Sequence, residues 1–481
     1  MQLSKRTYKD YAEYPERVLQ FGEGNFLRCF VDWMFHQLNK KAGFNGSVVV
    51  VQPIDKGMVN MLNEQDGLYT IYLPGLKNGK AESTHEVVDV ISRGINPYED
   101  FNAYLKTAEQ PEMRYVISNT TEAGITLDDN DSATATPPNS FPAKLAIWLY
   151  HRYQTFKGDV SKGLHIIPCE LIEKNADNLK KIIKQLAAKW GYEEGFVNWL
   201  DSACTFNNTL VDRIVPGYPR ERIPEITSEL GYEDKQVVEG EPFHLWVIQA
   251  DQQLQRELAF PSIGLDVLYV KDITPYRTRK VRILNGAHTA LVPVAYLYGI
   301  DTVRESVEDP VIGKFLKETI FDEIIPTLDL PKEELERFAN EVIDRFRNPY
   351  IKHLLMSISL NSWSKFETRV LPSIIEYKKR KGSIPQHLAF SLAATIAFYK
   401  GKRGEETISL NDDPAAVDLL KNAWAVSDGS DAGIKQVVTK VLGYDKNWKQ
   451  DLNKVEGLND AVTKHLVNIE KHGVKKAIEM L

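Results

Sequence analysis

Lys280, Asn285 and His288 are the first side chains in this chain whose types and spacing could do chemistry. Thr274 and Pro275 stand before them and are typical of a helix start, because a Thr hydroxyl caps free amides and proline lacks the N–H anyway. On a regular α-helix the three side chains would share a sector of about 140° and rise about 12 Å. Such a set suits the deprotonation of an alcohol. On spacing alone, a helix end with a snorkelling lysine and a satisfied histidine is an equally good interpretation.

The chemistry that fits these residues is hydride transfer assisted by a base. An alcohol loses its hydroxyl proton as hydride leaves, and a lysine whose pKa falls to about 7 or 8, through burial or nearby cations, serves as base. Arg279 and Arg282 are such cations in sequence. The side-chain amides of Asn208 and Asn285 could donate to the developing alkoxide. Gly286 costs about 1 kcal/mol inside a helix, so we expect another group to approach its backbone closely.

A glycine turn near the start of the chain indicates a dinucleotide site. A short apolar run, residues 17–21, leads directly into Gly22-Glu23-Gly24-Asn25-Phe26-Leu27-Arg28, and apolar residues then recur at helical spacing. Valines at 48–51 read as a strand buried on both faces. Strand, turn, helix and strand begin a βαβ unit whose glycines let backbone amides approach a pyrophosphate. The third glycine of the usual fingerprint is replaced by Leu27, so an ordinary tight turn is the alternative.

Alternating strands and helices continue to residue 273, and helices alone follow. We expect strands at 68–73 and 85–91 around an Asn78-Gly79 turn, then strands at 114–118, 164–168 and 243–248, an extended segment at 205–214, and helices at 97–108, 142–156 and 175–190. The later helices are expected at 332–347, 351–360, 386–400, 415–425 and 459–476. The sequence therefore predicts an α/β Rossmann-type nucleotide-binding domain, residues 1–273, followed by an all-α domain, residues 274–481.

Composition excludes several classes of protein. The chain has 481 residues and a net charge of −7, from 66 acidic and 59 basic residues. Without a basic block, nucleic acid and anionic membrane are poor partners. We find no P-loop, no GxSxG and no spacing of metal ligands, so we expect no metal. Three distant cysteines, Cys29, Cys169 and Cys204, and the lack of a secretion signal favour the cytoplasm.

Four motifs, in order along the chain, resemble those of the mannitol dehydrogenase family, the polyol-specific long-chain dehydrogenases. Residues 22–28 resemble its GxGxFxR cofactor turn, residues 208–214 its N-[ST]-M-V-D-R-I segment, residues 241–243 its E-P-F strand, and residues 280–288 its K-x4-N-x2-H pattern. The resemblance covers nearly the whole chain. It implies a metal-free, NAD-linked reaction on sugar alcohols, ketoses or their acids, and a monomer or at most a weak homo-oligomer.

The resemblance also implies residue roles. Lys280 is implied as the base, Asn208 and Asn285 as the oxyanion donors, and His288 as a substrate-positioning group. Polar residues 119–122 follow a buried strand, at the sheet edge where ligands bind in α/β folds. A carboxylate just after the second strand can accept from a ribose hydroxyl and repels the 2′-phosphate of NADP, although Lys56 is contrary evidence. The candidate cofactor-binding residues are Phe21, Gly22, Gly24, Asn25, Phe26, Arg28, Asp55, Asn119, Thr120, Thr121 and Glu122.

Within the family, residues 20–28, 49–55 and 274–280 most resemble the branch that reduces D-tagaturonate to D-altronate with NADH. Three residues before the base, mannitol and fructuronate enzymes carry Glu, whereas Arg277 stands here. Gln249-Ala250 replaces a Glu-Asp pair. Losing acids and gaining a cation is expected for a uronate substrate, which is an anion.

Two further cations are candidates to bind the substrate carboxylate. Lys365 aligns with a substrate-binding Arg of the family, and Arg369 lies one helical turn beyond it. Helix-surface charges are the alternative for Arg277 and Arg369. Reduction of fructuronate, oxidation of mannitol, and a non-catalytic sugar or nucleotide sensor are the alternative functions.

Overall fold

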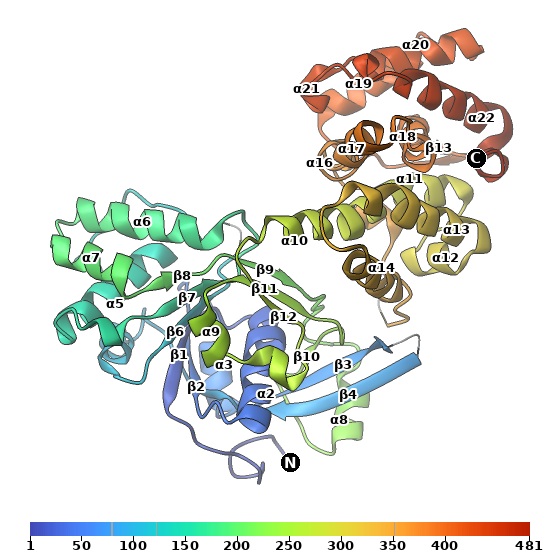
Figure 1. Ribbon diagram of the computed structural model, residues 1–481. Coiled ribbons are helices and arrows are strands. Elements are labelled where there is room, and N and C mark those ends of the chain that lie inside the picture. Colours follow the sequence, from blue (N-terminus) through green and yellow to red (C-terminus); the bar gives the residue numbers. More distant parts are fainter. Residues whose placement is uncertain (78–79, 122, 351) are drawn as a thin grey trace. The chain divides into compact units, whose positions relative to one another are not determined.

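The computed structural model describes residues 1–77, 80–121, 123–350 and 352–481. The chain forms two compact units, one of Met1–Pro74 with Ala81–Ile273 and one of Gly75–Lys80 with Thr274–Leu481 (Figure 1). The first unit is α/β. From Thr274 onward, the described chain is helical apart from a hairpin of two-residue strands, β13 (Lys402–Arg403) and β14 (Glu406–Thr407).

A six-stranded parallel sheet organises the first unit. Its strands are β1 (Glu16–Phe21), β2 (Ser47–Val51), β5 (Ile91–Ile95), β6 (Tyr115–Ser118), β7 (His165–Pro168) and β8 (Thr205–Phe206). They lie in the order β5-β2-β1-β6-β7-β8, and each neighbouring pair is parallel. Counted along the chain, this order is 3-2-1-4-5-6, the Rossmann order, which reverses between β1 and β6. The predicted Rossmann-type fold is confirmed, and its ligand-binding edge lies where β1 and β6 end.

Two hydrophobic cores cover the two faces of this sheet. On β1, Val18 belongs to the core under α2 (Trp33–Ala42), while Leu19 and Phe21 point to the other core. The second core is closed by α5 (Phe141–Thr155), α6 (Asn175–Lys189) and α7 (Glu194–Ser202) (Figure 1). Because parallel strands are buried on both faces, the valine run 48–51 alternates between the two cores in the same way.

Two smaller sheets complete the first unit. One has the order β10 (Val238–Glu239), β3 (Tyr69–Lys77) and β4 (Lys80–Val88), and the other β12 (Val267–Val270), β11 (Leu245–Gln249) and β9 (Thr209–Asp212). Strand β9 runs antiparallel to β11, with Thr209 opposite Ile248. The Gln249 amide donates to the Asn208 carbonyl over 2.8 Å, which fixes Asn208 at the end of β9.

Several expected elements differ in the structure. The expected strand 85–91 ends at Val88, and Ile91–Ile95 forms a separate strand of the parallel sheet, because the intervening Asp89 turns to pair with His36 on α2. Segment 205–214 divides into β8 and β9, which belong to different sheets. The helix expected at 97–108 begins later, as α4 (Phe101–Lys106), since the Asp100 side chain caps the amide of Ala103. The Asn78-Gly79 turn lies outside the described residues.

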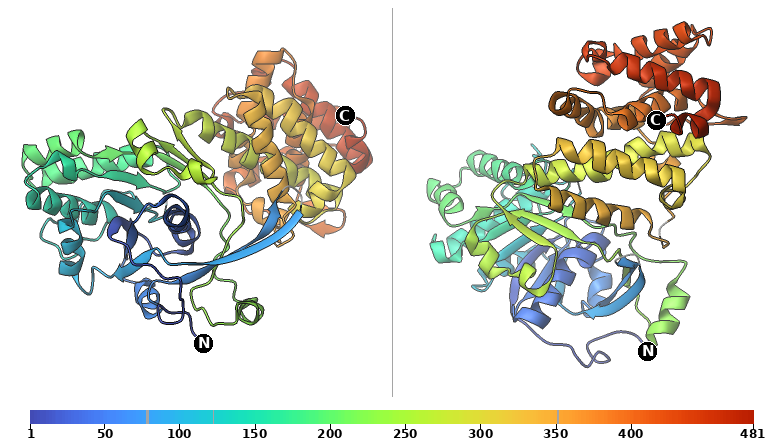
Figure 2. Two further views of the ribbon diagram at one scale, coloured as in Figure 1. Left: turned by 60° about the horizontal axis from the view of Figure 1, so that its bottom comes forward. Right: turned by 45° about the vertical axis from the view of Figure 1, so that its right-hand side comes forward.

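The second unit is built around α18 (Gln386–Phe398), whose residues from Leu388 onward are all buried. Helices α11 (Ala287–Tyr298) and α22 (Leu458–Ile478) pack on either side of it, and Figure 2 shows these layers. The remaining α-helices are α10 (Thr274–Arg279), α12 (Val303–Glu308), α13 (Pro310–Glu318), α14 (Lys332–Phe346), α15 (Leu355–Ile358), α16 (Ser362–Arg369), α17 (Leu371–Lys381), α19 (Pro414–Trp424), α20 (Asp431–Leu442) and α21 (Asp445–Trp448).

Two of the expected helices contain π-helical segments, so the prediction of uniform α-helix was wrong there. Arg28–Asp32 separates α1 (Asn25–Leu27) from α2, and Lys280–Gly286 separates α10 from α11. Both are the segments that carry candidate functional residues, which is where π-turns commonly occur. The helix expected at 351–360 is shorter, forming only α15, and residue 351 lies outside the described chain.

The three cysteines, Cys29, Cys169 and Cys204, are free and buried. Burial raises the pKa of each thiol, to about 12 for Cys204, so they are chemically quiet core residues. Over the described residues, no helix combines the length and apolarity that crossing a membrane requires.

The two glycines of the first turn should respond differently to substitution. Gly22 has φ +118°, and an added Cβ would lie 2.9 Å from the Asn119 carbonyl oxygen. Gly24 has φ −68°, and a Cβ there would meet nothing within 4 Å. We expect Gly22→Ala to lower the free energy of unfolding by more than about 1 kcal/mol, and Gly24→Ala to change it by less than about 0.5 kcal/mol. Urea denaturation of both variants checks this, and equal losses would contradict it.

Candidate active site

The glycine turn lies where β1 meets its two neighbours. The Gly22 amide donates to the Val51 carbonyl over 3.1 Å, and the Asn119 amide donates to the Phe21 carbonyl over 3.0 Å. The Phe21 ring is fully buried, 4.8 Å from the Phe141 ring centroid. Phe21 can therefore offer a ligand only its backbone. Gly24, in contrast, borders open space at the start of α1.

Arg28 holds this turn from inside the protein. Its side chain is 1% exposed and donates to the Glu23 carbonyl over 3.2 Å, the Gln236 carbonyl over 2.6 Å and Asn25 Oδ1 over 2.7 Å. Burial lowers the pKa of Arg28 from its usual value. With all three nitrogens engaged by protein acceptors, Arg28 shapes the turn, and its partner Asn25 is occupied in the same contact. Phe26 stacks on Phe30 at 5.1 Å.

The buried acid Glu23 links the turn to the loop after β2. Its Oε1 accepts from the Met58 amide over 3.1 Å, and burial raises the pKa of this carboxyl. Gln52, at the end of β2, donates to the carbonyls of Ile54 and Asp55 over 2.9 and 3.1 Å. These contacts shape the loop so that Asp55 is exposed, as a cofactor-binding carboxylate must be.

The polar loop after β6 is held by an acid that the sequence analysis did not identify. Glu170 is buried just beyond β7, and it accepts from the Thr120 amide over 3.0 Å, the Thr120 hydroxyl over 2.9 Å and the Ser118 hydroxyl over 3.0 Å. Asn119 Nδ2 donates to the Cys169 carbonyl over 3.0 Å. Thr121 has φ +72°, a strained conformation for a β-branched residue. An acid directly after a buried strand is the signal that could have identified Glu170; Glu122 lies outside the described residues.

Asn208 is a helix cap as well as a candidate donor. Its Oδ1 accepts from the amides of Ala176 and Asp177, at the start of α6, over 3.0 and 3.1 Å. Its Nδ2 donates to Gln249 Oε1 over 3.2 Å. A side-chain amide has two N–H groups, so a second donor remains for a ligand. Asn208 belongs to the first unit, whereas Lys280, Asn285 and His288 belong to the second.

The π-helical segment changes the geometry expected for the lysine and the asparagine. Lys280 opens the segment and Asn285 is its sixth residue. A π-turn contains more residues than an α-turn, so a residue five positions on returns nearly to the same side of the helix. The sector of about 140° that a regular α-helix would give is therefore wrong, and the two side chains lie closer to a common face. Both are half-buried.

Gly286 explains why this segment packs so closely on α16. A Cβ at Gly286 would lie 2.9 Å from the Arg369 carbonyl oxygen, the last residue of α16. The expected close approach is confirmed, and its partner is a backbone carbonyl. Arg282 donates to the same end of α16, to the Thr368 carbonyl over 3.3 Å and the Arg369 carbonyl over 3.5 Å. The structure thus brings the Lys365–Arg369 helix against the Lys280 segment.

His288 lies in an apolar stack beside these residues. Its ring stacks on Phe346, with centroids 4.0 Å apart and planes 20° apart, and meets the His353 ring edge-on at 5.2 Å. Nε2 of His288 is buried and, among the described residues, has no hydrogen-bond partner. Burial, with the charges of His353, Arg345 and Arg369, holds the pKa of His288 well below its usual value. A neutral imidazole with an unused nitrogen fits a group that positions a substrate hydroxyl.

The candidate cations differ in their surroundings. Lys365 Nζ donates to the Ile358 carbonyl over 2.9 Å, and burial with the Arg369 charge lowers the pKa of Lys365. Burial also lowers the pKa of Arg369. Arg277 is half-buried on α10. Arg279, expected to influence the lysine, instead pairs with Glu334 on α14 over 2.6 Å.

Over the described residues, no group of three or more His, Cys, Asp or Glu side chains is placed to hold a metal ion. The chemistry available is that of a lysine, two amides, a neutral histidine and several cations. The lysine and the neutral histidine of the second unit suit proton transfer and hydroxyl positioning, and the open glycine turn of the first unit, at the switch point of a Rossmann sheet, suits a dinucleotide.

Two histidines of the second unit should have pKa values shifted in opposite directions, His288 downward and His387 upward. Burial would lower the pKa of His387, but hydrogen bonds and charge from Glu323 and Glu318 raise it above its usual value. An ordinary histidine is half-protonated at about pH 6.5. At that pH we expect His288 to be neutral and His387 to be an imidazolium, as read by NMR of ring-labelled protein with His288→Gln and His387→Gln for assignment. A protonated His288 at pH 6 would contradict the stacked geometry, in which Nε2 is buried.

Comparison with known proteins places these residues in a family. Residues 16–262 match the mannitol dehydrogenase Rossmann domain, and residues 272–470 match the mannitol dehydrogenase C-terminal domain. Altronate oxidoreductase of Bacillus subtilis (strain 168) is 48% identical over 477 residues, which cover 99% of this chain and 97% of that protein.

Two solved structures share the fold at 21% identity. D-sorbitol dehydrogenase in substrate-free form has a TM-score of 0.83 and covers 99% of this chain and 100% of its own. Pseudomonas fluorescens mannitol 2-dehydrogenase, in a ternary complex with NAD and D-mannitol, has a TM-score of 0.67 and covers 100% and 99%. The chain therefore belongs to the mannitol dehydrogenase family.

Proposed function

We propose that the chain is an NAD-linked oxidoreductase that interconverts D-tagaturonate and D-altronate. D-tagaturonate, NADH and a proton give D-altronate and NAD⁺. The observation that carries this proposal is the 48% identity to an altronate oxidoreductase over essentially both full lengths. The candidate lysine, asparagines and histidine are all present.

Residues 1–273 bind the cofactor and residues 274–481 supply the base and bind the substrate. On the cysteine pattern we place the reaction in the cytoplasm, with the protein a monomer or weak homo-oligomer.

The residues of the first unit fit a dinucleotide. Space left open at Gly24 lets a pyrophosphate approach the backbone amides, while Gly22 keeps the turn tight against Asn119. The exposed carboxylate of Asp55 suits a ribose 2′-hydroxyl and repels a 2′-phosphate, which favours NAD over NADP. NAD, when bound, supplies the hydride acceptor for oxidation and, as NADH, the donor for reduction. Phe21 offers this site its backbone, and Arg28 shapes the turn through its contacts with the Glu23 carbonyl and the Asn25 side chain.

The proposed chemistry assigns one task to each side chain. Lys280 removes the hydroxyl proton in oxidation and returns a proton to the ketone oxygen in reduction. Asn208 and Asn285 donate to that oxygen as negative charge develops, a contribution of typically about 3 kcal/mol for one donor. Neutral His288 uses its unpartnered Nε2 to hold a substrate hydroxyl. Lys365, Arg369 and Arg277 bind the carboxylate, since an ammonium that gives one hydrogen to Ile358 has two left.

Lys280→Ala should abolish turnover without abolishing cofactor binding. The base is lost, and general base catalysis typically contributes about 10²–10⁴-fold. NADH binding followed by fluorescence should stay near wild type, because Lys280 lies in the second unit and the cofactor residues in the first. If kcat fell by less than about a hundredfold, Lys280 would not be the base.

Lys365→Ala should remove much of the preference for an acid substrate. A charge-assisted hydrogen bond contributes about 1.5–3 kcal/mol, so wild-type protein should favour tagaturonate over fructose by at least about tenfold in kcat/KM. The variant should lose most of its rate on tagaturonate and far less on fructose. Lys352→Ala, an exposed lysine nearby in sequence, is the control. Equal losses on both substrates would give Lys365 a structural role.

The function as a whole is tested by NADH and NADPH consumption against tagaturonate, fructuronate, fructose and ketose phosphates. We expect the highest kcat/KM with NADH and tagaturonate. A higher value with fructuronate or fructose would make the chain a fructuronate reductase or a mannitol 2-dehydrogenase. Absence of turnover with every substrate, despite NADH binding, would favour a sensor.

A further inference from the structure

A pocket of the first unit lies at the amino ends of the parallel strands, away from the glycine turn at their carboxyl ends. Its volume is about 570 Å³, within the range of small-molecule sites. Arg17 near the start of β1 and Tyr115 at the start of β6 line it, so it opens at the amino ends of the strands. None of the residues assigned to cofactor or substrate belongs to its lining.

The lining carries an excess of positive charge over an apolar floor. Four cations, Arg17, Arg114, Lys162 and Arg256, face two acids, Glu112 and Glu257, which leaves an excess of two charges (four less two). The floor is formed by Leu38, Phe44 and Met113, all buried.

The two acids compensate only two of the cations. Arg114 Nε and Nη2 bind Glu257 over 3.0 and 2.8 Å, and Arg17 lies 3.6 Å from Glu112, whose side chain is 59% exposed. Lys162 and Arg256 make no ion pair within the described chain. Arg17 Nε is buried and, among the described residues, has no hydrogen-bond acceptor. The pocket therefore presents to an anion two cations, Lys162 and Arg256, that are held in no ion pair of the described chain.

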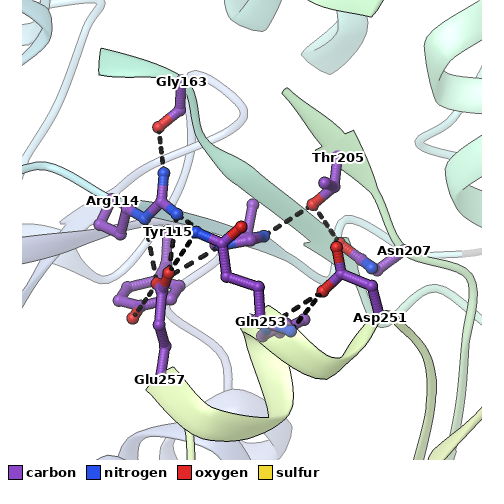
Figure 3. Close-up of polar contacts among 10 residues, drawn as sticks. Arg114, Tyr115, Gly163, Thr205, Asn207, Asp251, Gln253 and Glu257 are labelled. Carbon is purple, nitrogen blue, oxygen red and sulfur yellow. Dashed lines mark hydrogen bonds and ion pairs between the residues drawn. The ribbon is translucent and has the colours of Figure 1, made fainter. Parts of the chain in front are cut away.

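Arg114 also begins a chain of hydrogen bonds that leads toward the candidate active site. Its Nη2 lies 2.9 Å from His165 Nε2. A guanidinium can only donate, so Nε2 accepts and the ring proton sits on Nδ1. Nδ1 then donates to the Thr205 hydroxyl over 2.7 Å, and Thr205 donates to Asn207 Oδ1 over 2.8 Å (Figure 3).

This series of hydrogen bonds ends beside Asn208. Asn207 Nδ2 donates to the Gln249 carbonyl over 2.9 Å, and the Gln249 side chain accepts from Asn208 Nδ2 over 3.2 Å. Hydrogen bonds thus hold Asn207, Asn208 and Gln249 as one group.

We propose that this pocket binds a small organic dianion, a phosphate monoester or a dicarboxylate, and that binding changes turnover through His165, Thr205 and Asn207. The charge of a dianion matches the excess of two, since a phosphate monoester carries about −1.5 to −2 at pH 7. Arginine forks are the usual partners of phosphate and carboxylate oxygens.

The coupling follows from the hydrogen-bond directions. Glu257 Oε2 lies 3.4 Å from His165 Nε2, the nitrogen that now accepts from Arg114. An anion that draws Arg114 away leaves Glu257 as the acceptor for Nε2, so the ring proton moves from Nδ1 to Nε2 with no change in net charge. Nδ1 then accepts from the Thr205 hydroxyl, and Thr205 no longer donates to Asn207. The pocket therefore has two hydrogen-bond arrangements that a ligand can shift.

Binding is tested on the full chain by isothermal titration with glucose 6-phosphate and with succinate. Glucose and sodium chloride at matched ionic strength are the controls for the sugar and for screening. We expect one probe to bind, which identifies the phosphate or the carboxylate source, and the double variant K162Q/R256Q to bind it at least about tenfold more weakly. Lys181→Gln, an exposed lysine of α6, is the matched control and should bind like wild type. No binding by either probe, or equal binding by K162Q/R256Q, overturns the site.

Coupling is tested by turnover with and without the bound probe. We expect a change in kcat/KM of about fivefold or more at saturation in wild type, and none in K162Q/R256Q, whose basal rate is unchanged. Thr205→Val, which keeps shape but cannot pass on a hydrogen bond, should still bind the probe and lose the response. A probe that binds without changing turnover, or a Thr205→Val protein that responds like wild type, overturns the coupling. The coupling rests on the proposed role of Asn208, whereas the binding arm needs no turnover, so their failures are distinguishable.

Discussion

The candidate substrate site depends on the close approach of Gly286 to the carbonyl of Arg369. Any larger residue would push α16 away, because its Cβ would meet that oxygen at 2.9 Å. The contact joins the segment that carries Lys280 and Asn285 to the helix that carries Lys365 and Arg369. Arg282 completes it by donating to the same carbonyls. The proposed base and the proposed anion-binding pair, about 80 residues apart in sequence, thus lie on two segments that pack against each other.

A similar constraint operates in the first unit, where Gly22 allows β1 and the loop after β6 to meet at the switch point. The loops around this point are held by buried acids. Glu23 holds the loop that carries Asp55, and Glu170 holds the loop that carries Thr120. These buried carboxylates, of which Glu23 accepts one of the hydrogen bonds described above and Glu170 three, fix the shapes of their loops, so the cofactor edge is preorganised.

Sequence patterns predicted the sheet, the glycine turn and the helical second unit, because strand burial, turn glycines and helix periodicity are local signals. They did not predict the π-segments, since an i→i+5 bond leaves no distinct apolar period in so short a stretch. They placed Arg28 in the glycine turn but did not give its acceptors, which come from Glu23, Asn25 and the distant Gln236. Long-range partners of polar residues are set by the fold, and one sequence does not contain them.

The positive charges of the second unit support the proposed preference for an anionic substrate over a neutral sugar. Burial lowers the pKa of Lys365 and Arg369, and the Arg369 charge lowers that of both Lys365 and His288. Lys365 and Arg369 are half-buried, so their two positive charges repel each other and solvent screens them only in part. A carboxylate arriving there relieves the repulsion, whereas a neutral ketose leaves it in place. His288 contributes by remaining neutral, because a further positive charge stacked on Phe346 would add to the repulsion and would leave its nitrogen unable to accept from a hydroxyl.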